Sequence, residues 1–515
     1  MIDATPLLRL YAARRRRQLD REDAWAAQER VLAGLIARAR DTAFGRAHGF
    51  AEIRDADAFR ARVPVRDYEA MWGAFWQEPF PTLDDTSWPG RMPFFALSSG
   101  TTAGRTKYIP VSREMVASNR RAALDILVHH LGRRPDSKVL GGRSFMLGGS
   151  TALETLAPGV RAGDLSGIAT ATVPVWARGR TFPPADLALL ADWEAKIEAL
   201  VPASREADVR AISGTPTWLL AFFERLAQAA PRLGPSLTDF YPNLELIIHG
   251  GVAMAPYRQR FERLIEGTRV RLAEVFPASE GFFAIQDGGP EAGMRLLVDN
   301  GIFYEFVEPA TLDTPSPRRL TLREAALGED YALVVSTNAG LFAYAVGDLV
   351  RLVSKAPPRI LFAGRTAYTL SAFGEHVSGA ELEAAMVAAA GAIEAQIVDY
   401  SAGARHRARG AASDHHLVIV ELVDGAIEPA RAARLRDALD AALVRGNADY
   451  ATHRAARQLA APELIVAPTG TFHAWMAARG KLGGQNKAPR VIADEGLLAS
   501  LERAAGSGTR VPAGR

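Results

Sequence analysis

Residues 98–107 read SSGTTAGRTK, a string of small, hydroxylated and glycine residues that ends in a lysine. An apolar run at 93–97 precedes it and Tyr108–Ile109 follows it, which predicts a loop that leaves a β-strand. Glycine lets a backbone approach an anion closely, and the hydroxyls and the lysine supply hydrogen-bond donors. Lysine is rare in this chain, at positions 107, 138, 196, 355, 481 and 487. Its presence here favours a cradle for a nucleotide triphosphate over a flexible Ser/Thr/Gly turn, which stays open as the alternative.

The spacing of this loop differs from those of two common phosphate-binding loops. Gly100, Gly104 and Lys107 follow neither the G-x-x-x-x-G-K-[ST] order of the Walker A loop nor the G-x-G-x-x-G order of dinucleotide-binding folds. The residues predicted to hold phosphate are Ser98, Ser99, Gly100, Thr101, Thr102, Gly104 and Lys107.

The composition excludes several classes of protein. The chain has 515 residues, of which 48% are hydrophobic and 23% charged, as expected for a globular protein of two to four domains. A formal net charge of +3 lacks the basic excess of a nucleic-acid binder. The chain contains no cysteine, which excludes disulfides, thiol nucleophiles, thiolate zinc sites and iron–sulfur clusters.

Targeting and membrane signals are not found in the sequence. The Arg14–Arg17 run is followed by Gln18–Arg21 rather than by an apolar segment, and no stretch approaches about 18 uninterrupted apolar residues. We therefore expect a cytoplasmic location without a membrane partner. The arginine run is predicted to lie on a solvated helix face, with a patch for an acidic partner as the alternative.

Short β-type runs alternate with helical stretches, which predicts an α/β fold with several β-sheets flanked by helices. Strands are predicted at 144–147, 211–212, 244–248, 270–275, 331–337, 359–363, 416–422 and 463–466. Helices are predicted within 1–45 and at 113–131, 184–200, 217–226, 256–265, 381–390 and 430–444.

The pattern changes near residue 364, which predicts a second domain. We expect a large N-terminal domain over 1–365, a hinge over 366–377, a smaller, mobile α+β domain over 378–505 and a disordered tail over 506–515.

Several further motifs resemble landmarks of one family. Together with the loop at 98–107, their order resembles the adenylate-forming enzymes and, more narrowly, the bacterial branch of the GH3 acyl acid–amido synthetases. In chain order the landmarks are Gly163–Gly167, Ser213–Pro216, Tyr241–Glu245, His249–Val252, Phe276–Phe283, Thr337–Leu341, Val346–Asp348 and Gly480–Arg490.

The resemblance implies a role for each candidate side chain. Lys107 and the loop around it hold the departing pyrophosphate, Gly250 and Gly251 face the adenine, and Phe276, Ala278 and Ser279 flank it. Glu280 faces the phosphates through Mg²⁺, directly or indirectly. Asp348 accepts hydrogen bonds from the ribose hydroxyls, and Arg365 reaches ribose or phosphate. Lys487, with Lys481 as second candidate, stabilises charge on the α-phosphate.

Each of these residues, taken alone, also has a simpler interpretation. A glycine pair after a strand is a plain turn, Glu280 is a surface residue, Asp348 is a turn residue, and Lys487 lies in a solvated basic loop. The chain also departs from the family pattern at two positions. Ala345 stands where many relatives carry arginine, and His376 stands where plant relatives carry lysine, so neither role is transferred.

The resemblance implies an ATP- and Mg²⁺-dependent ligase. An acyl acid reacts with ATP to give an acyl-adenylate, and an amine, most simply an amino acid, then attacks it after the small domain rotates. An acyl-CoA ligase and a non-catalytic nucleotide-binding regulatory protein are the alternatives. Small-molecule substrates are the only partners expected, for a monomer or weak dimer. Walls of the acyl pocket are expected at 113–131 and 148–172, whereas core packing is the expected role of Trp176, Phe182 and Trp218.

Overall fold

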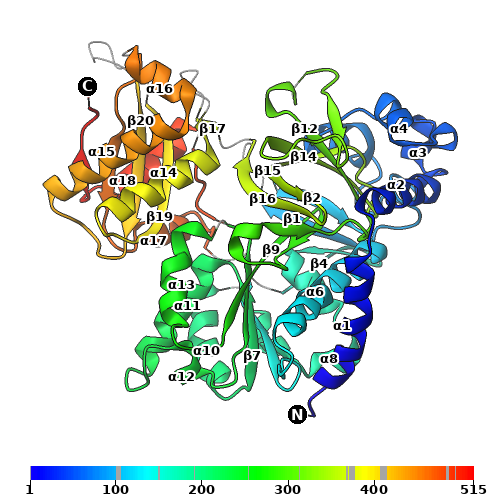
Figure 1. The fold of residues 1–515 in the computed structure, drawn as a ribbon, viewed down its shortest axis with the longest axis horizontal. Coiled ribbons are helices and arrows are strands. Elements are labelled where there is room, and N and C mark those ends of the chain that lie inside the picture. The colour runs from blue at the N-terminus through cyan, green and yellow to red at the C-terminus, as the bar shows by residue number, and fades with distance from the viewer. Residues whose placement is uncertain are drawn as a thin grey trace. The chain divides into compact units, whose positions relative to one another are not determined.

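The structure is a computed structural model that describes residues 2–99, 106–148, 151–190, 192–252, 254–312, 314–366, 369–370, 377–405, 414–456, 458–482, 487–492 and 494–514. The chain divides into two compact units (Figure 1). The first comprises Met1–Val252 and Phe261–Phe362, and the second comprises Ala253–Arg260 and Ala363–Arg515. A short piece from the middle of the chain, Ala253–Arg260, is therefore part of the second unit, whereas the sequence predicts it within the large domain over 1–365.

The helices of the first unit begin at side chains that cap them. Asp23, Thr42, Asp55 and Asp67 each accept a hydrogen bond from a backbone N–H in the first turn that follows. The helices are α1 (Thr5–Asp20), α2 (Ala24–Ala39), α3 (Ala43–Ala47), α4 (Ala56–Arg62), α5 (Tyr68–Met71), α6 (Arg113–Arg133), α7 (Leu165–Ala171), α8 (Val175–Arg178), α9 (Ala185–Ala188), α10 (Trp193–Arg205), α11 (Pro216–Ala229) and α12 (Leu237–Phe240). Short helical turns are η1 (Phe50–Glu52), η2 (Trp72–Trp76), η4 (Pro290–Ala292) and η5 (Pro309–Thr311).

A 12-stranded mixed sheet forms the centre of the first unit, in the order β13-β12-β14-β15-β16-β11-β10-β9-β8-β7-β3-β6. Strands β7, β8 and β9 run parallel, so their carboxyl ends meet at one edge. The strands are β3 (Arg143–Met146), β6 (Thr181–Phe182), β7 (Val209–Gly214), β8 (Leu246–Gly250), β9 (Arg271–Ala278), β10 (Gly281–Ile285), β11 (Met294–Leu296), β12 (Ile302–Val307), β13 (Arg319–Thr321), β14 (Asp330–Thr337), β15 (Tyr344–Lys355) and β16 (Pro358–Arg365).

A separate four-stranded sheet carries the predicted phosphate loop. Its order is β2-β1-β5-β4, with β1 (Phe94–Ser99) paired antiparallel to β2 (Thr106–Val111) and parallel to β5 (Val160–Gly163). The edge strand is β4 (Glu154–Ala157). Helix α6 packs on the 12-stranded sheet and α1 packs on α6, as Figure 1 shows (α1 in blue).

The arginine run of α1 does not lie wholly in solvent, which corrects the sequence-based expectation. Arg15 is 5% exposed and forms a two-point ion pair with Asp125 of α6, while its Nη1 donates to Asp299 at 2.6 Å. Arg14 and Arg17 are exposed. The sequence did not reveal this pair because its partners lie more than 100 residues away; the helix is held to the unit by a buried charge as well as by Leu8 and Ala12.

We predict a pH-dependent stability that depends on Glu22. Burial raises the pKa of Glu22 from its ordinary 4.5 to about 7, and the charge of Asp299 adds to the shift. The raised folded-state pKa favours the folded state fully below pH 4.5, and this contribution is lost as the pH rises through 7. At pH 8, the free energy of unfolding of Glu22→Gln is therefore expected to exceed that of the wild type by about 2 kcal/mol, so the variant unfolds at a higher urea concentration.

The urea midpoints of both proteins at several pH values check this prediction. The difference between them should shrink towards zero as the pH falls well below 4.5, where Glu22 is protonated in both the folded and the unfolded state. A difference that stays constant with pH would exclude a titrating Glu22 as its cause.

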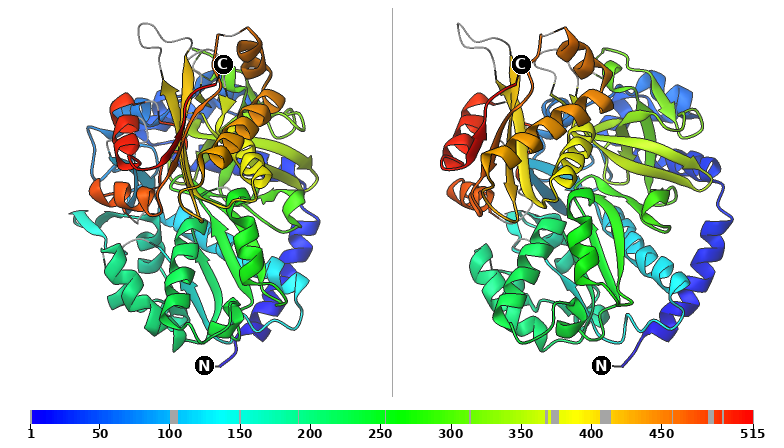
Figure 2. Two further views of the ribbon diagram at one scale, coloured as in Figure 1. Left: turned by 90° about the vertical axis from the view of Figure 1, so that its left-hand side faces the viewer. Right: turned by 60° about the vertical axis from the view of Figure 1, so that its left-hand side comes forward.

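The second unit has a four-stranded sheet covered on both faces, in the order β19-β20-β21-β22. Alternate residues of β20 point to opposite faces. Val418 and Val420 pack with α14 and α15, whereas Leu417 and Ile419 pack with α17 and α18. Figure 2 (right) shows the red helix α18 on one side of these strands and the orange α15 on the other.

The elements of this unit are η3 (Ala255–Tyr257), the start of α13 (Arg258–Leu264), β17 (Thr369–Leu370), β18 (Val377–Ser378), α14 (Gly379–Ala392), β19 (Ile397–Arg405), β20 (His415–Leu422), α15 (Pro429–Gly446), α16 (Ala448–Ala455), β21 (Glu463–Ala467), α17 (Thr471–Ala478), α18 (Glu495–Ala504) and β22 (Thr509–Val511). The sequence predicts a disordered tail over 506–515, and the structure corrects this. Thr509–Val511 pairs antiparallel with β21, and Val511 is buried against α15.

Candidate active site

The β1–β2 hairpin positions both ends of the predicted phosphate loop. Ser98 lies opposite Lys107 across the ladder, and Ser99 lies opposite Thr106. Directly opposed residues of antiparallel strands are close neighbours, so the Ser98 and Lys107 backbones are fixed side by side at the open end of the hairpin. The predicted residues Gly100, Thr101, Thr102 and Gly104 lie outside the described residues.

The Lys107 side chain contacts the aromatic ring of Tyr68, a residue that the sequence analysis did not identify. The Nζ of Lys107 lies 5.3 Å from the centroid of the Tyr68 ring, which is a cation–π distance. The Tyr68 hydroxyl accepts a hydrogen bond from the backbone N–H of Tyr108 at 3.0 Å. Burial raises the pKa of Tyr68 to about 12, so the phenol stays neutral at physiological pH. No motif marked Tyr68, because its contact with Lys107 spans 39 positions of sequence.

Tyr344 belongs to the same aromatic group and is influenced by the charge of Glu280. Tyr344 is fully buried, and burial raises its pKa well above the usual value, with a further upward contribution from the negative charge of Glu280. The Trp76 ring lies between the two tyrosines, 6.1 Å from the Tyr68 centroid and 6.5 Å from that of Tyr344. Lys107 therefore borders an aromatic group formed by Tyr68, Trp76 and Tyr344, and the negative charge of Glu280 acts on Tyr344 of this group.

The carboxyl ends of β8 and β9 bring two predicted motifs together. Gly250 lies opposite Val275, so Gly250–Gly251 runs beside Phe276–Ala278. A Cβ on Gly250 would lie 2.4 Å from the carbonyl oxygen of Val275, and Gly251 has a φ of +85°. The close approach of β9 and the turn both require glycine here. In open α/β sheets, ligands bind beyond the carboxyl ends of parallel strands, as at this edge.

The β9–β10 hairpin presents Ser279 and Glu280 at its tip. Ala278 pairs with Gly281, which leaves Ser279 and Glu280 as the two-residue turn. The Phe276 ring is 7% exposed and packs edge-on against neighbouring phenylalanine rings, so it contributes to the core. Any contact of Phe276 with a nucleotide then depends on its backbone.

Asp348 lies at an irregularity of the sheet. The pairing of β14 with β15 shifts between Ala332 and Val334, so β15 carries extra residues around Asp348. Gly347 adopts a φ of +88°, which the bulge requires, and Asp348 is 3% exposed. A carboxylate held at a bulge of a central strand has a fixed position, which suits the recognition of a diol.

Arg365 and the late lysines belong to the second unit. Arg365 ends β16 and is half-buried, after Gly364 with a φ of +122°. Lys487 is exposed, whereas Lys481 is half-buried and its backbone N–H donates to Met476. The first unit contains the phosphate hairpin, the strand ends, Glu280 and Asp348, and the second unit carries Lys487 and Arg365. His376 lies outside the described residues.

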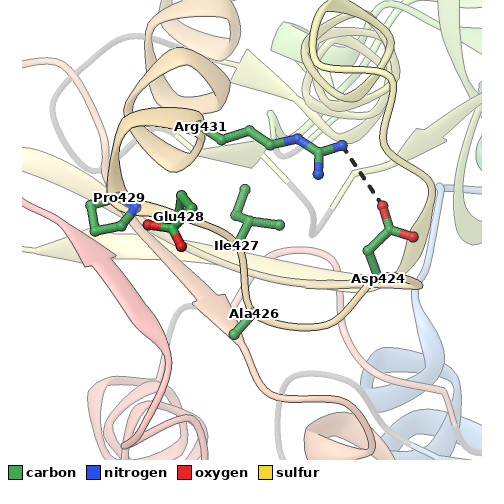
Figure 3. A pocket seen from close by; sticks show the side chains of 6 residues that line it. All are labelled: Asp424, Ala426, Ile427, Glu428, Pro429 and Arg431. Atoms are coloured by element: carbon green, nitrogen blue, oxygen red, sulfur yellow. Dashed lines mark ion pairs between the residues drawn. The ribbon is translucent and has the colours of Figure 1, made fainter.

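A pocket of about 480 Å³ lies elsewhere, at the start of α15 (Figure 3). Asp424, Ala426, Ile427, Glu428, Pro429 and Arg431 line it. Arg431 forms an ion pair with Asp424 at 3.7 Å, and Glu428 adds a second negative charge. None of the predicted site residues lines this pocket, and its two carboxylates disfavour a phosphate ligand.

The expected core role of Phe182 agrees with the structure, because Phe182 is buried edge-on against Phe145. Trp218 is only half-buried, with its ring 5.0 Å from that of Trp193. Nothing is described of the Trp176 side chain. Among the described residues, no group of three or more His, Asp or Glu side chains is placed to hold a metal ion. No described helix combines the length and apolarity that a membrane span requires.

Comparison with known proteins finds one family throughout the chain. Models of the GH3 family match in order, the N-terminal domain at residues 14–155, the central domain at 295–365 and the C-terminal domain at 380–496. A probable indole-3-acetic acid-amido synthetase of Oryza sativa subsp. japonica is 26% identical, over 91% of this chain and 88% of its own.

Two solved structures share the fold at low sequence identity. The AtGH3.15 acyl acid amido synthetase in complex with 2,4-DB superposes with a TM-score of 0.77 at 18% identity, over 96% of this chain and 95% of its own. A 2-hydroxyisobutyryl-CoA ligase in complex with 2-HIB-AMP gives a TM-score of 0.60 at 19% identity, over 93% and 91%.

Proposed function

This chain belongs to the GH3 family of acyl acid–amido synthetases, and on that premise we propose that it forms an amide from an acyl acid and an amino acid in two half-reactions driven by ATP. The observation that carries the proposal is the arrangement in the first unit. Lys107 lies against the ring of Tyr68, in the aromatic group that also contains Tyr344, and the negative charge of Glu280 acts on Tyr344 although 173 positions of sequence separate Lys107 from Glu280. A cation and a carboxylate at one place suit a nucleotide triphosphate, with its phosphates and its metal ion.

In the first half-reaction, a carboxylate oxygen of the acid attacks the α-phosphorus, and the bond to the β-phosphate breaks to release pyrophosphate. Ser98 to Thr102, Gly104 and Lys107 hold the departing pyrophosphate. Gly250 and Gly251 face the adenine, with the backbone of Phe276–Ser279 beside them. Asp348 and Arg365 hold the ribose, and Arg365 also reaches phosphate.

The residues present are compatible with a Mg²⁺ ion that is held mainly by the substrate phosphates. Glu280 supplies one carboxylate, at the tip of a two-residue turn. Mg²⁺ keeps several waters and binds through one or two carboxylates and substrate phosphates, so a cluster of three protein ligands is not required. When bound, the ion neutralises negative charge on the phosphates. Glu280 orients it directly or through water.

In the second half-reaction, the nitrogen of the amine attacks the acyl carbon, and the bond to the phosphate oxygen breaks to release AMP. A deprotonated amine needs no general base on the protein. Lys487 acts in the first half-reaction alone, where its ammonium stabilises charge on the α-phosphate. The small domain then rotates about a hinge at 366–377, so one site serves both reactions. The proposal includes a cytoplasmic location and small-molecule partners only.

Pyrophosphate release tests this function. Purified protein is incubated with ATP, Mg²⁺ and a panel of aryl, indolyl, fatty and amino-substituted acids, and release above the acid-free background is expected for at least one class. Addition of amino acids should then give AMP and an amide. Turnover with CoA instead of an amino acid would identify an acyl-CoA ligase, and no release with any acid would favour a non-catalytic nucleotide-binding protein.

We predict that Asp348→Ala raises the KM for ATP about 10- to 30-fold, because the ribose loses hydrogen bonds to a charged acceptor. Steady-state kinetics at varied ATP measures this. Asp348→Asn keeps the shape of the buried side chain and is expected to show a smaller rise. An unchanged KM in a folded Asp348→Ala protein would remove Asp348 from the ribose site.

A further inference from the structure

Arg490, three residues after Lys487, is held by contacts on several sides. Its guanidinium pairs with Asp399 and donates to the carbonyl oxygen of Tyr400 at 2.9 Å. The same group lies 4.3 Å from the centroid of the Tyr400 ring. Its Nη2 donates to the hydroxyl of Tyr257 at 2.7 Å, and the side chain is only 15% exposed. Few rotamers of Arg490 preserve all of these contacts.

The backbone around Arg490 is fastened to β19 as well. The carbonyl oxygen of Arg490 accepts a hydrogen bond from the N–H of Ala402 at 2.8 Å, and the N–H of Ile492 donates to the carbonyl oxygen of Ala402 at 2.8 Å. The hydroxyl of Ser401 donates to the carbonyl oxygen of Pro489 at 2.7 Å. The segment 489–492 is therefore a fixed element beside the sheet.

Tyr257 comes from the short N-terminal piece of the second unit. It ends η3, which packs against α14 and β19, and it is 1% exposed. Burial raises the pKa of Tyr257 to about 12, so its neutral hydroxyl is available as an acceptor. Gly251, at the proposed adenine site, lies six residues earlier in the chain. The Tyr257–Arg490 hydrogen bond thus joins two segments of the second unit that are far apart in the sequence.

We propose that Arg490 and Tyr257 are positioning residues for Lys487, a role that rests on the proposed function. Three residues of chain span at most about 10 Å, so the fixed position of Arg490 limits the positions that the Lys487 backbone, and with it the ammonium, can occupy. Electrostatic stabilisation of a transition state depends steeply on placement, and a shift of about 1 Å is costly. The Tyr257 hydroxyl accepts the hydrogen bond that completes the contacts of the Arg490 guanidinium.

A positioning role and a merely structural role differ in which half-reaction they affect. Lys487 acts in adenylation alone, so a residue that acts through Lys487 must affect adenylation and spare the attack of the amine on a supplied acyl-adenylate. A residue that only stabilises the unit affects both half-reactions, through the fraction of folded protein.

The test uses Tyr257→Phe, which removes the hydroxyl and keeps the ring. We expect adenylation in a single turnover to slow at least about 10-fold, the lower end of the loss for one hydrogen bond to a charged group, with an unchanged KM for ATP. Aminolysis of supplied acyl-adenylate should keep the wild-type rate. In a Lys487→Ala background, Tyr257→Phe should cause no further loss.

Tyr450→Phe is the matched control. Tyr450 is fully buried in the same unit, and its hydroxyl donates to Asp440 at 2.7 Å, away from Arg490. This variant should lower the unfolding midpoint as much as Tyr257→Phe does while it leaves adenylation unchanged. Wild-type adenylation is measured first, so a failure of the proposed function shows there, before any variant is compared, and the positioning role falls with it.

Three results with Tyr257→Phe would overturn the positioning role when the wild type is active. They are an unchanged rate of adenylation, an equal loss in both half-reactions, and a further loss of the same size in the Lys487→Ala background.

Discussion

Lys487→Ala is expected to form acyl-adenylate about 10²- to 10³-fold more slowly than the wild type while binding ATP normally. The side chain is proposed to stabilise charge that accumulates on the α-phosphate only in the transition state, so its loss lowers the rate constant rather than the affinity. Single-turnover release of pyrophosphate measures the rate, and a nucleotide-binding titration measures the affinity.

Lys481→Ala is the matched control for this variant. Lys481 carries the same charge six residues earlier, and its backbone is fixed to Met476. Its removal should change adenylation less than threefold. If Lys481→Ala showed the large loss and Lys487→Ala the small one, the two roles would be exchanged. If both variants formed acyl-adenylate at the wild-type rate, neither Lys481 nor Lys487 would act on the α-phosphate.

Lys107→Ala is expected to lower kcat/KM for ATP in adenylation about 100-fold. The ammonium holds the departing β- and γ-phosphates, and its charge-assisted contacts strengthen as pyrophosphate leaves. Initial rates at varied ATP measure the loss. Unlike Asp348→Ala, which should act on KM, this variant should lower kcat as well.

Lys355→Ala provides the comparison for Lys107→Ala. Lys355 ends β15 in the same unit and donates to the carbonyl oxygen of Arg323 on the surface. Both variants lose one positive charge, so the comparison separates the local contact from long-range electrostatics. A Lys107→Ala enzyme as efficient as Lys355→Ala would mean that the hairpin does not hold the phosphates.

The parts of the fold that could be predicted are those with local signals. The runs at 244–248 and 270–275 are mostly apolar, and their bounds lie within three residues of those of β8 and β9. The loop at 98–107 lies between its two predicted apolar flanks, which form β1 and β2. Periodicity, glycine pairs and hydroxyl-rich loops act over a few residues, so one sequence is enough to detect them.

The rest depends on contacts that no local pattern encodes. The helix predicted over 184–200 is two helices, because Asp192 caps a new one at Trp193. Arg15 belongs to a run that the sequence predicts to be solvated, but in the fold it forms ion pairs with Asp125 and Asp299. The aromatic group is scattered in sequence, and only the fold brings Tyr68, Trp76 and Tyr344 together beside Lys107.

The interrupted path of the chain matters to anyone who divides this protein for expression. A fragment that starts at Ala363 keeps the whole four-stranded sheet but loses Tyr257, which the unit draws from far upstream. The guanidinium of Arg490 then loses its hydrogen bond to the Tyr257 hydroxyl, and α14 and β19 lose their contacts with η3. Such a truncated product should expose apolar surface and associate with itself, whereas a fusion that restores residues 253–260 should not.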